Sequence, residues 1–218
     1  MIKSKDELEK IAQENGLTLD YLTCGSPIFQ CKNLYTFTSD SISLAHSVEE
    51  DNIDTLIDMC AGSGVVGLEV VGIRNVKKLV LVELQEELAK IAKLSSENTT
   101  KDTEIIVLNK DVKTLDKELA GECCDVVTCN PPYFKVGSGE VPTNLSRAMA
   151  RHEVTLTLDD IIRTAHYLLK NNGKLYLIHI NSRLNEIKKL LKKYEFNMLN
   201  FQILSGKLER VIVSAEKM

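Results

Sequence analysis

The chain has 218 residues, of which 44% are hydrophobic and 27% are charged. This composition excludes wholesale disorder, and a chain of this length buries enough apolar surface to fold without disulfides or a structural metal. The formal net charge of −4 excludes a protein that is basic over its whole surface. The charge is uneven, because residues 170–218 hold ten Lys and Arg against four acidic residues, whereas residues 1–60 hold four against eleven.

The first fifty residues predict a short segment ahead of the main fold. Ser4 to Glu7 has the pattern of a capping box, for a helix that ends at Gly16. A short strand is predicted at 28–31, and a second helix follows Asp40. We expect this segment, residues 1–50, to form a cap over a larger core.

From residue 53 on, apolar strands alternate with helices. Strands are predicted at 55–59, 78–83, 104–108, 124–129 and 173–179, and helices at 65–72, 85–98, from 157 onward and at 182–194. Two last strands, at 197–204 and 209–215, follow one another without a helix. The alternation predicts a mostly parallel sheet covered on both faces, and the final pair adds an antiparallel edge. We expect one α/β domain over 1–218, with a Rossmann-like core at 51–218.

Metal sites and membrane segments are not indicated. The six cysteines contain no C-x-x-C pair, and none has the His spacing that zinc prefers. No apolar run approaches the ~20 residues that cross a bilayer, and the first residues lack the apolar segment of a signal peptide. We expect a cytoplasmic protein, monomeric, with no metal and no membrane contact.

A glycine-rich motif marks a nucleotide site. Gly62, Gly64 and Gly67 form G-x-G-x-x-G directly after a predicted strand and before a helix, where glycines let the backbone approach a ligand. Glu83 ends the next strand, at the distance where an acidic side chain accepts hydrogen bonds from ribose hydroxyls. This motif alone leaves two interpretations open, NAD for a dehydrogenase and S-adenosylmethionine for a methyltransferase.

The segment Asp-Met-Cys-Ala-Gly-Ser-Gly at 58–64 resembles motif I of class I methyltransferases. The resemblance implies that the cofactor contacts Asp58, Cys60, Ala61, Gly62 and Gly64. Asp111 lies just past the third core strand, where that fold has a polar side chain near the adenine amine. The same residue is equally suited to cap the short helix that follows, and both interpretations stay open.

Asn130-Pro131-Pro132-Tyr133 follows the fourth core strand directly. The two prolines stiffen the backbone and remove two N–H donors. The Asn130 side-chain oxygen and the Pro131 carbonyl can both accept from a planar NH2 group, which orients an exocyclic amine and stabilises the positive charge it develops. Tyr133 offers a flat face on which a flipped base can stack. The motif predicts amine methylation with these four residues at the catalytic centre, Asn130 also lying beside the cofactor.

Together these motifs resemble the amino-directed methyltransferases, and among them the bacterial tRNA(Val) adenine-N(6) methyltransferase family, which modifies the adenine 3′ of the anticodon. The closer similarity is carried by residues 30–45, 133–135 and 150–160, and it spans about 17–215. Ser39 departs from the family, whose members commonly have Gly there. The resemblance implies a class I fold with a seven-stranded, mostly parallel sheet and an antiparallel edge strand, S-adenosylmethionine as cofactor, tRNA as substrate and Asp40 as a further cofactor contact.

The expected RNA contacts come from a long loop and a basic helix. The lysines at 188, 189, 192 and 193 recur at helical spacing, a pattern typical of a solvated face and also of phosphate contacts. The substrate contacts that we predict are Tyr133, Lys135, Arg151, His152, Lys189 and Lys193.

Three alternative functions stay open. A protein glutamine N-methyltransferase acting on a release factor presents a similar NH2 group to the same motif, although the segments at 30–45 and 150–153 argue against it. An NAD-dependent dehydrogenase explains the glycine loop but leaves Asn130 to Tyr133 without a role. An RNA-binding protein with a degenerate fold is disfavoured by the intact motif and by Glu83.

Overall fold

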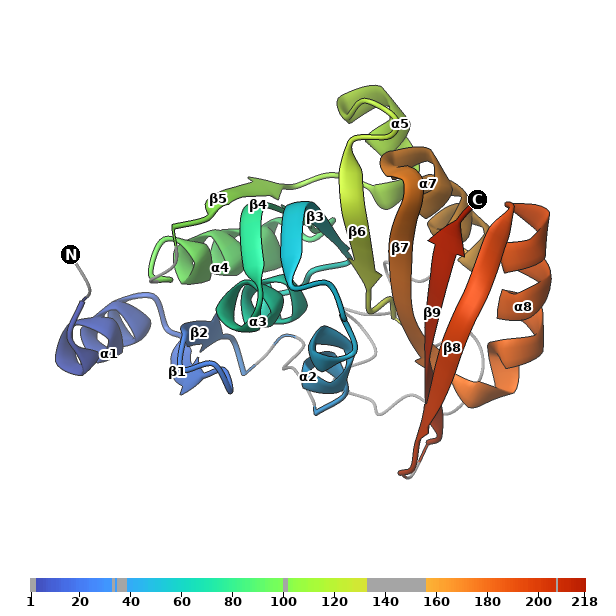
Figure 1. The fold of residues 1–218 in the computed structure, drawn as a ribbon. Coiled ribbons are helices and arrows are strands. Elements are labelled where there is room, and N and C mark those ends of the chain that lie inside the picture. Colours follow the sequence, from blue (N-terminus) through green and yellow to red (C-terminus); the bar gives the residue numbers. More distant parts are fainter. Residues whose placement is uncertain (1–2, 33, 35–38, 100–101, 133–155, 207) are drawn as a thin grey trace.

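A seven-stranded sheet forms the centre of the molecule (Figure 1). The computed structural model describes residues 3–32, 34, 39–99, 102–132, 156–206 and 208–218. In spatial order the strands are β5 (Glu104–Leu108), β4 (Asn75–Val82), β3 (Asn52–Met59), β6 (Cys124–Cys129), β7 (Leu169–Ile180), β9 (Arg210–Lys217) and β8 (Phe196–Leu204). The pairs from β5 to β7 are parallel, and β9 is antiparallel to both of its neighbours. The expected mostly parallel α/β sheet is confirmed, with the antiparallel strand one place in from the edge.

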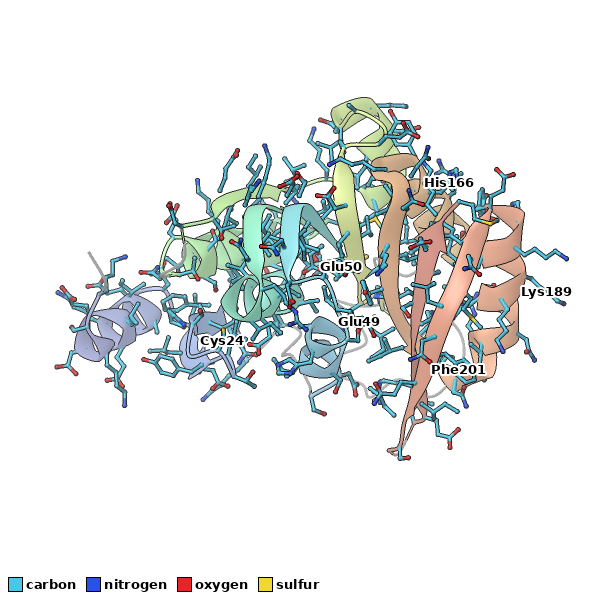
Figure 2. The ribbon with its side chains drawn as sticks, viewed as in Figure 1. Cys24, Glu49, Glu50, His166, Lys189 and Phe201 are labelled. Atoms are coloured by element: carbon cyan, nitrogen blue, oxygen red, sulfur yellow. The ribbon has the colours of Figure 1, made fainter. Side chains whose placement is uncertain are left out.

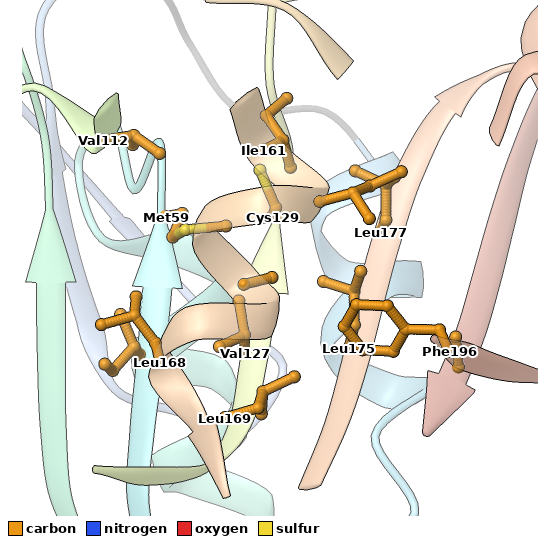
Figure 3. Packing of buried hydrophobic residues seen from close by; sticks show 14 of the residues in the cluster. Met59, Val112, Val127, Cys129, Ile161, Leu168, Leu169, Leu175, Leu177 and Phe196 are labelled. Atoms are coloured by element: carbon orange, nitrogen blue, oxygen red, sulfur yellow. The ribbon is translucent and has the colours of Figure 1, made fainter. Parts of the chain in front are cut away.

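Helices cover both faces of this sheet. One face packs against α2 (Ser39–His46), α3 (Val65–Ile73) and α4 (Glu86–Ser96), and the other against α5 (Leu115–Glu118), α7 (Leu158–Leu168) and α8 (Leu184–Lys193). Figure 3 shows the second face, where Ile161 and Leu168 of α7 lie among Val127 and Leu175 of the sheet. Because both faces are covered, the central strands end in continuous buried runs rather than in alternating patterns, with Asp58 the polar exception in β3.

The N-terminal segment adds a helix and a hairpin. The capping box of α1 (Lys5–Glu14) is present as predicted, and the strand predicted at 28–31 is β2 (Pro27–Gln30). Its antiparallel partner β1 (Thr18–Tyr21) was not expected, because four residues are too few to show an apolar period. Phe29 of β2 is fully buried and donates its N–H to Ser95 Oγ of α4 at 3.1 Å.

Buried polar contacts hold the N-terminal segment to α3. The Glu69 carboxylate is fully buried and accepts hydrogen bonds from the Thr23 hydroxyl and, at 2.8 Å, from His46 Nε2. One turn further on, Gly72 packs so closely on Cys24 that a methyl group at this glycine would overlap the cysteine side chain. The segment between β1 and β2 is therefore tied to the helix that follows the glycine-rich loop.

Several strand boundaries differ from the prediction, since β3 and β4 each begin three residues early, and the start of β7 differs most. β7 begins at Leu169 rather than at 173, because Asn172 and Gly173 have the composition of a turn but continue the strand. Asn172 adopts a left-handed conformation with φ of 63°, and the pairing with β6 shifts register between Cys124 and Val126. Residues whose local sequence favours a turn are therefore part of an irregular start of the strand.

Candidate active site at the ends of the parallel strands

The candidate site lies where the strand order reverses. The chain passes from β3 to β4 and β5 on one side, and β6 pairs with β3 on the other, so the β3–β6 junction is a topological switch point. Met59 of β3 pairs with Val82 of β4 and with Cys129 of β6, which brings three strand ends to one level. The residues that begin the three loops at this level are Cys60, Glu83 and Asn130.

The glycine-rich loop turns sharply away from β3. Cys60 and Gly62 have φ of 60° and 57°, and Gly64 has φ of 92°, all in the left-handed region. Ala61 N–H donates to Val82 O at 2.9 Å, which holds the loop against β4. A Cβ atom added at Gly62 would meet nothing within 4 Å, so the backbone faces open space there. The loop leaves room for a ligand against its main chain.

Glu83 connects the end of β4 to this loop. Its buried carboxylate accepts from Gly62 N–H through Oε2 and from Gln85 N–H through Oε1, each at 2.8 Å. Burial raises the pKa of this carboxyl above its ordinary value, against the lowering effect of the backbone donors. Asn109, which sequence reasoning did not single out, donates from Nδ2 to Glu83 O at 2.9 Å and fixes the backbone there.

Asp58 turns into the protein rather than toward the open side. It is fully buried, and its two oxygens accept from Gly67 N–H at 3.0 Å and from Thr128 Oγ1 at 2.8 Å. These bonds join β3, the first turn of α3 and β6 beneath the loop. Burial raises the pKa of Asp58 to about 7. Its direct contact with a cofactor stays a prediction, whereas its support of the loop is visible.

Asp58→Asn is expected to weaken the pH dependence of stability. The pKa of Asp58 rises from 3.8 to about 7 on folding, so the folded protein keeps a proton that the unfolded chain releases. This contribution to the free energy of unfolding is complete below about pH 4 and is lost as the pH rises through about 7, by up to ~1.4 kcal/mol per pH unit. Asparagine cannot ionise, so Asp58→Asn should lose less stability than the wild type over this window.

Urea unfolding of the wild type and of Asp58→Asn across this window measures the difference. Asp116→Asn, at an exposed aspartate, is the matched control and should follow the wild-type curve. Wild-type and Asp58→Asn curves that stay parallel from about pH 4 to about pH 7 would contradict a buried, proton-binding Asp58.

A residue of α2 holds the Asn130 side chain by a hydrogen bond. Its Nδ2 donates to Ser41 Oγ at 3.0 Å, and Ser41 is almost completely buried. Because a primary amide has its nitrogen and oxygen on opposite sides, this bond fixes the direction of Asn130 Oδ1. Asp40, beside Ser41, pairs with Arg210 Nε of β9 at 2.7 Å, which anchors the start of α2. Sequence reasoning missed Ser41, and the contact of Asp40 with a cofactor stays a prediction.

The other predicted site residues differ in burial and in their contacts. Asp111 caps the 3-10 turn Val112–Thr114 by accepting from Lys113 N–H at 2.9 Å, and it remains half-buried. Lys193 Nζ lies 2.6 Å from Asp159 Oδ1, whereas Lys189 is exposed. Pro131 is buried and Pro132 half-buried at the end of β6. The predicted contacts that lie outside the described residues are Tyr133, Lys135, Arg151 and His152.

The described part of the site fits a nucleoside with two adjacent hydroxyls. The Glu83 carboxylate is buried beside the open space at Gly62, and each carboxylate oxygen has a further lone pair for a hydroxyl donor. Within the described ranges, His, Cys and acidic side chains do not gather in threes in a way that could hold a metal ion. No helix in those ranges has both the length and the apolar character that crossing a bilayer requires.

Comparisons with known proteins identify a family and related sequences. Residues 44–158 match the family model described as Conserved hypothetical protein 95. A protein of Shewanella halifaxensis named tRNA1(Val) (adenine(37)-N6)-methyltransferase is 23% identical over 191 residues, covering 88% of this chain and 72% of that protein. A protein of the same name from Shewanella baltica is 27% identical over 173 residues, covering 78% and 68%.

Solved structures share the fold. The crystal structure of Methanocaldococcus jannaschii Trm5 in complex with adenosine matches with a TM-score of 0.67 at 16% identity, over 93% of this chain and 56% of that one. At this identity the likeness concerns the fold, which is that of class I methyltransferases.

Proposed function

The chain belongs to the Conserved hypothetical protein 95 family, and on this premise we propose that it is an S-adenosylmethionine-dependent methyltransferase that methylates the exocyclic amine of an adenine in tRNA. The relatives from two Shewanella species, named as tRNA1(Val) adenine-N6 methyltransferases, support adenine 37 of that tRNA as the finer target. The fold and the chemistry of the site support the same reaction class.

One observation carries the proposal, namely the pairing of Met59 with Cys129. It sets the loop that begins at Cys60 and the amide of Asn130 on neighbouring strands, ~4.8 Å apart at the backbone. A cofactor on the glycine-rich loop and an amine at Asn130 are then adjacent. A dehydrogenase would need the loop and Glu83 but would have no use for an amide aimed at this position.

The residues of the site have different roles in the proposed reaction. Glu83 and the backbone at Gly62 would hold the ribose and the adjoining part of the cofactor. S-adenosylmethionine, when bound, would supply an electrophilic methyl group on a sulfonium centre. The methyl–sulfur bond would break as the lone pair of the amine forms the new bond to carbon, and the amine would afterwards lose one proton. Asn130 Oδ1 would accept a hydrogen bond from the amine, which orients its lone pair and stabilises the positive charge on nitrogen.

Ligand-dependent melting tests the cofactor. S-adenosylmethionine at about 100 times its Kd should stabilise the wild type by ~2.7 kcal/mol, whereas NAD should leave the melting temperature unchanged. Stabilisation by NAD alone would contradict the proposal and favour the dehydrogenase.

Product analysis tests the substrate. The enzyme is incubated with S-adenosylmethionine and either unmodified tRNA(Val) or a release factor, and the digests are analysed by mass spectrometry. We expect N6-methyladenosine in the tRNA and no methylglutamine in the protein. Methylglutamine without methyladenosine would overturn the proposed substrate class while leaving the methyltransferase assignment in place.

A further inference from the structure

The edge strand β8 exposes an apolar row. Leu199, Phe201 and Ile203 are 44%, 42% and 46% exposed, although they are large hydrophobic side chains. Edge strands usually carry charged residues that discourage contacts, yet β8 contains no Lys, Arg, Asp or Glu. An exposed apolar row of this kind is a candidate binding surface.

The sheet register relates this row to the candidate site. Phe201 pairs with Val213 of β9, which pairs in turn with Leu177 of β7. Leu177 pairs with Cys129 of β6, the residue before Asn130. Phe201 therefore stands in the same row across the sheet as Cys129, directly before the proposed amine-binding motif. Three strand spacings separate the two backbones, a span of about 14 Å.

A lysine of α8 adjoins the same row, and two further lysines of this helix are exposed. Lys188 Nζ lies 4.8 Å from the centroid of the Phe201 ring, so this face of α8 adjoins β8. The ammonium groups of Lys189 and Lys192 are exposed and have no hydrogen-bond or ion-pair partner among the residues that the structure describes. Figure 2 shows Lys189 extending outward from α8 and Phe201 on the lower part of β8. Lys193 instead points to Asp159.

We propose that Phe201, Lys188, Lys189 and Lys192 form a second RNA contact, here called the β8 platform, which holds an unpaired base close to the methylated adenine. This inference rests on the proposed function, since it takes RNA as the substrate. The base stacks on the exposed part of the Phe201 ring, and the lysines contact the phosphates on either side of it. Loops are the part of a folded RNA that offers such unstacked bases.

Charge favours RNA over a protein occupant. A second copy of this chain, pairing β8 with β8, would bring two sets of these lysines together, whereas RNA neutralises them. At the ~3.4 Å rise of stacked nucleotides the span of about 14 Å corresponds to roughly four nucleotides at most, so the base on the β8 platform would lie within the same loop as the target. Contact with the platform thereby explains how the enzyme selects an RNA loop. Recognition of one flipped adenine alone does not provide this selectivity.

A single tryptophan tests the contact directly, because the chain contains none. We expect the fluorescence of Phe201→Trp to be quenched saturably by an unmodified tRNA(Val) anticodon stem-loop and not by a fully paired RNA duplex of equal length. Tyr21→Trp is the matched control, since Tyr21 is also 42% exposed but lies on β1, away from β8 (Figure 1). Its fluorescence should not respond to either RNA.

Kinetics supply the second measurement. Phe201→Ala should raise KM for the stem-loop by roughly 5–150-fold, the usual worth of one stacked base, with kcat and the affinity for S-adenosylmethionine unchanged. An unchanged melting temperature shows that the variant is folded.

Three outcomes would overturn the β8 platform. The first is that RNA does not quench the fluorescence of Phe201→Trp although the enzyme still methylates RNA. The second is that the stem-loop and the duplex quench it equally. The third is that its emission shifts with protein concentration in the absence of RNA, which indicates a second copy bound to β8. A wild type that methylates no RNA would instead refute the proposed function, and the two failures are thus distinguishable.

Discussion

Asn130→Ala is expected to lower kcat for methyl transfer by roughly 10²–10³-fold, the effect of removing one preorganised polar group from a transition state. The side chain adjoins the cofactor loop but is aimed by Ser41, and it is proposed to contact the amine rather than the cofactor. Binding of S-adenosylmethionine should therefore be nearly unchanged. Single-turnover kinetics at saturating tRNA and calorimetric titration with S-adenosylmethionine measure the two quantities separately.

Ser41→Ala separates positioning from direct contact. This variant keeps the Asn130 amide but removes the acceptor at 3.0 Å that orients it, so we expect a smaller loss of kcat than in Asn130→Ala. An Asn130→Ala enzyme that lost cofactor affinity in proportion to its activity would contradict the assigned role, because the side chain would then act in binding rather than in the transition state.

The sequence predicted those features whose residues are close together in the chain. The glycine-rich loop and Glu83 lie within one strand–helix–strand unit, so their arrangement follows from the alternation of strands and helices. The mostly parallel sheet could be predicted for the same reason. In contrast, β1 was missed because its four residues are too few to show an apolar period. The first residues of β7 were missed because Asn172 and Gly173 have the composition of a turn.

The supporting contacts of the site could not be read from the sequence. Ser41 and Asn130 are 89 positions apart, and Asp58 and Thr128 are 70 apart, so their meeting depends on strand order and register. Lys193 is a comparable case, since helical spacing marked it as a phosphate contact but only the packing of α7 against α8 brings Asp159 to its ammonium group. The ion pair favours Lys189 over Lys193 as the lysine to test.

Glu83→Ala is expected to weaken binding of S-adenosylmethionine by roughly one to two decades, because hydrogen bonds to a charged acceptor are worth ~1.5–3 kcal/mol. The carboxylate is buried beside the open side of Gly62, so few water molecules can replace it. Calorimetric titration of the folded variant gives the change in Kd. Glu87→Ala, at an exposed glutamate in the first turn of α4, is the matched control and should bind as the wild type does.

The pH dependence of binding distinguishes the carboxylate from a merely structural side chain. Burial raises the pKa of Glu83, so acidification protonates it at a higher pH than an exposed glutamate. A protonated carboxyl is a weaker acceptor for ribose hydroxyls, and the affinity of the wild type should fall as the pH drops through this raised pKa. In Glu83→Ala that fall should disappear along with the affinity. If the variant kept the wild-type pH profile, a different group would control cofactor binding, and Glu83 would serve only to hold the Gly62 backbone.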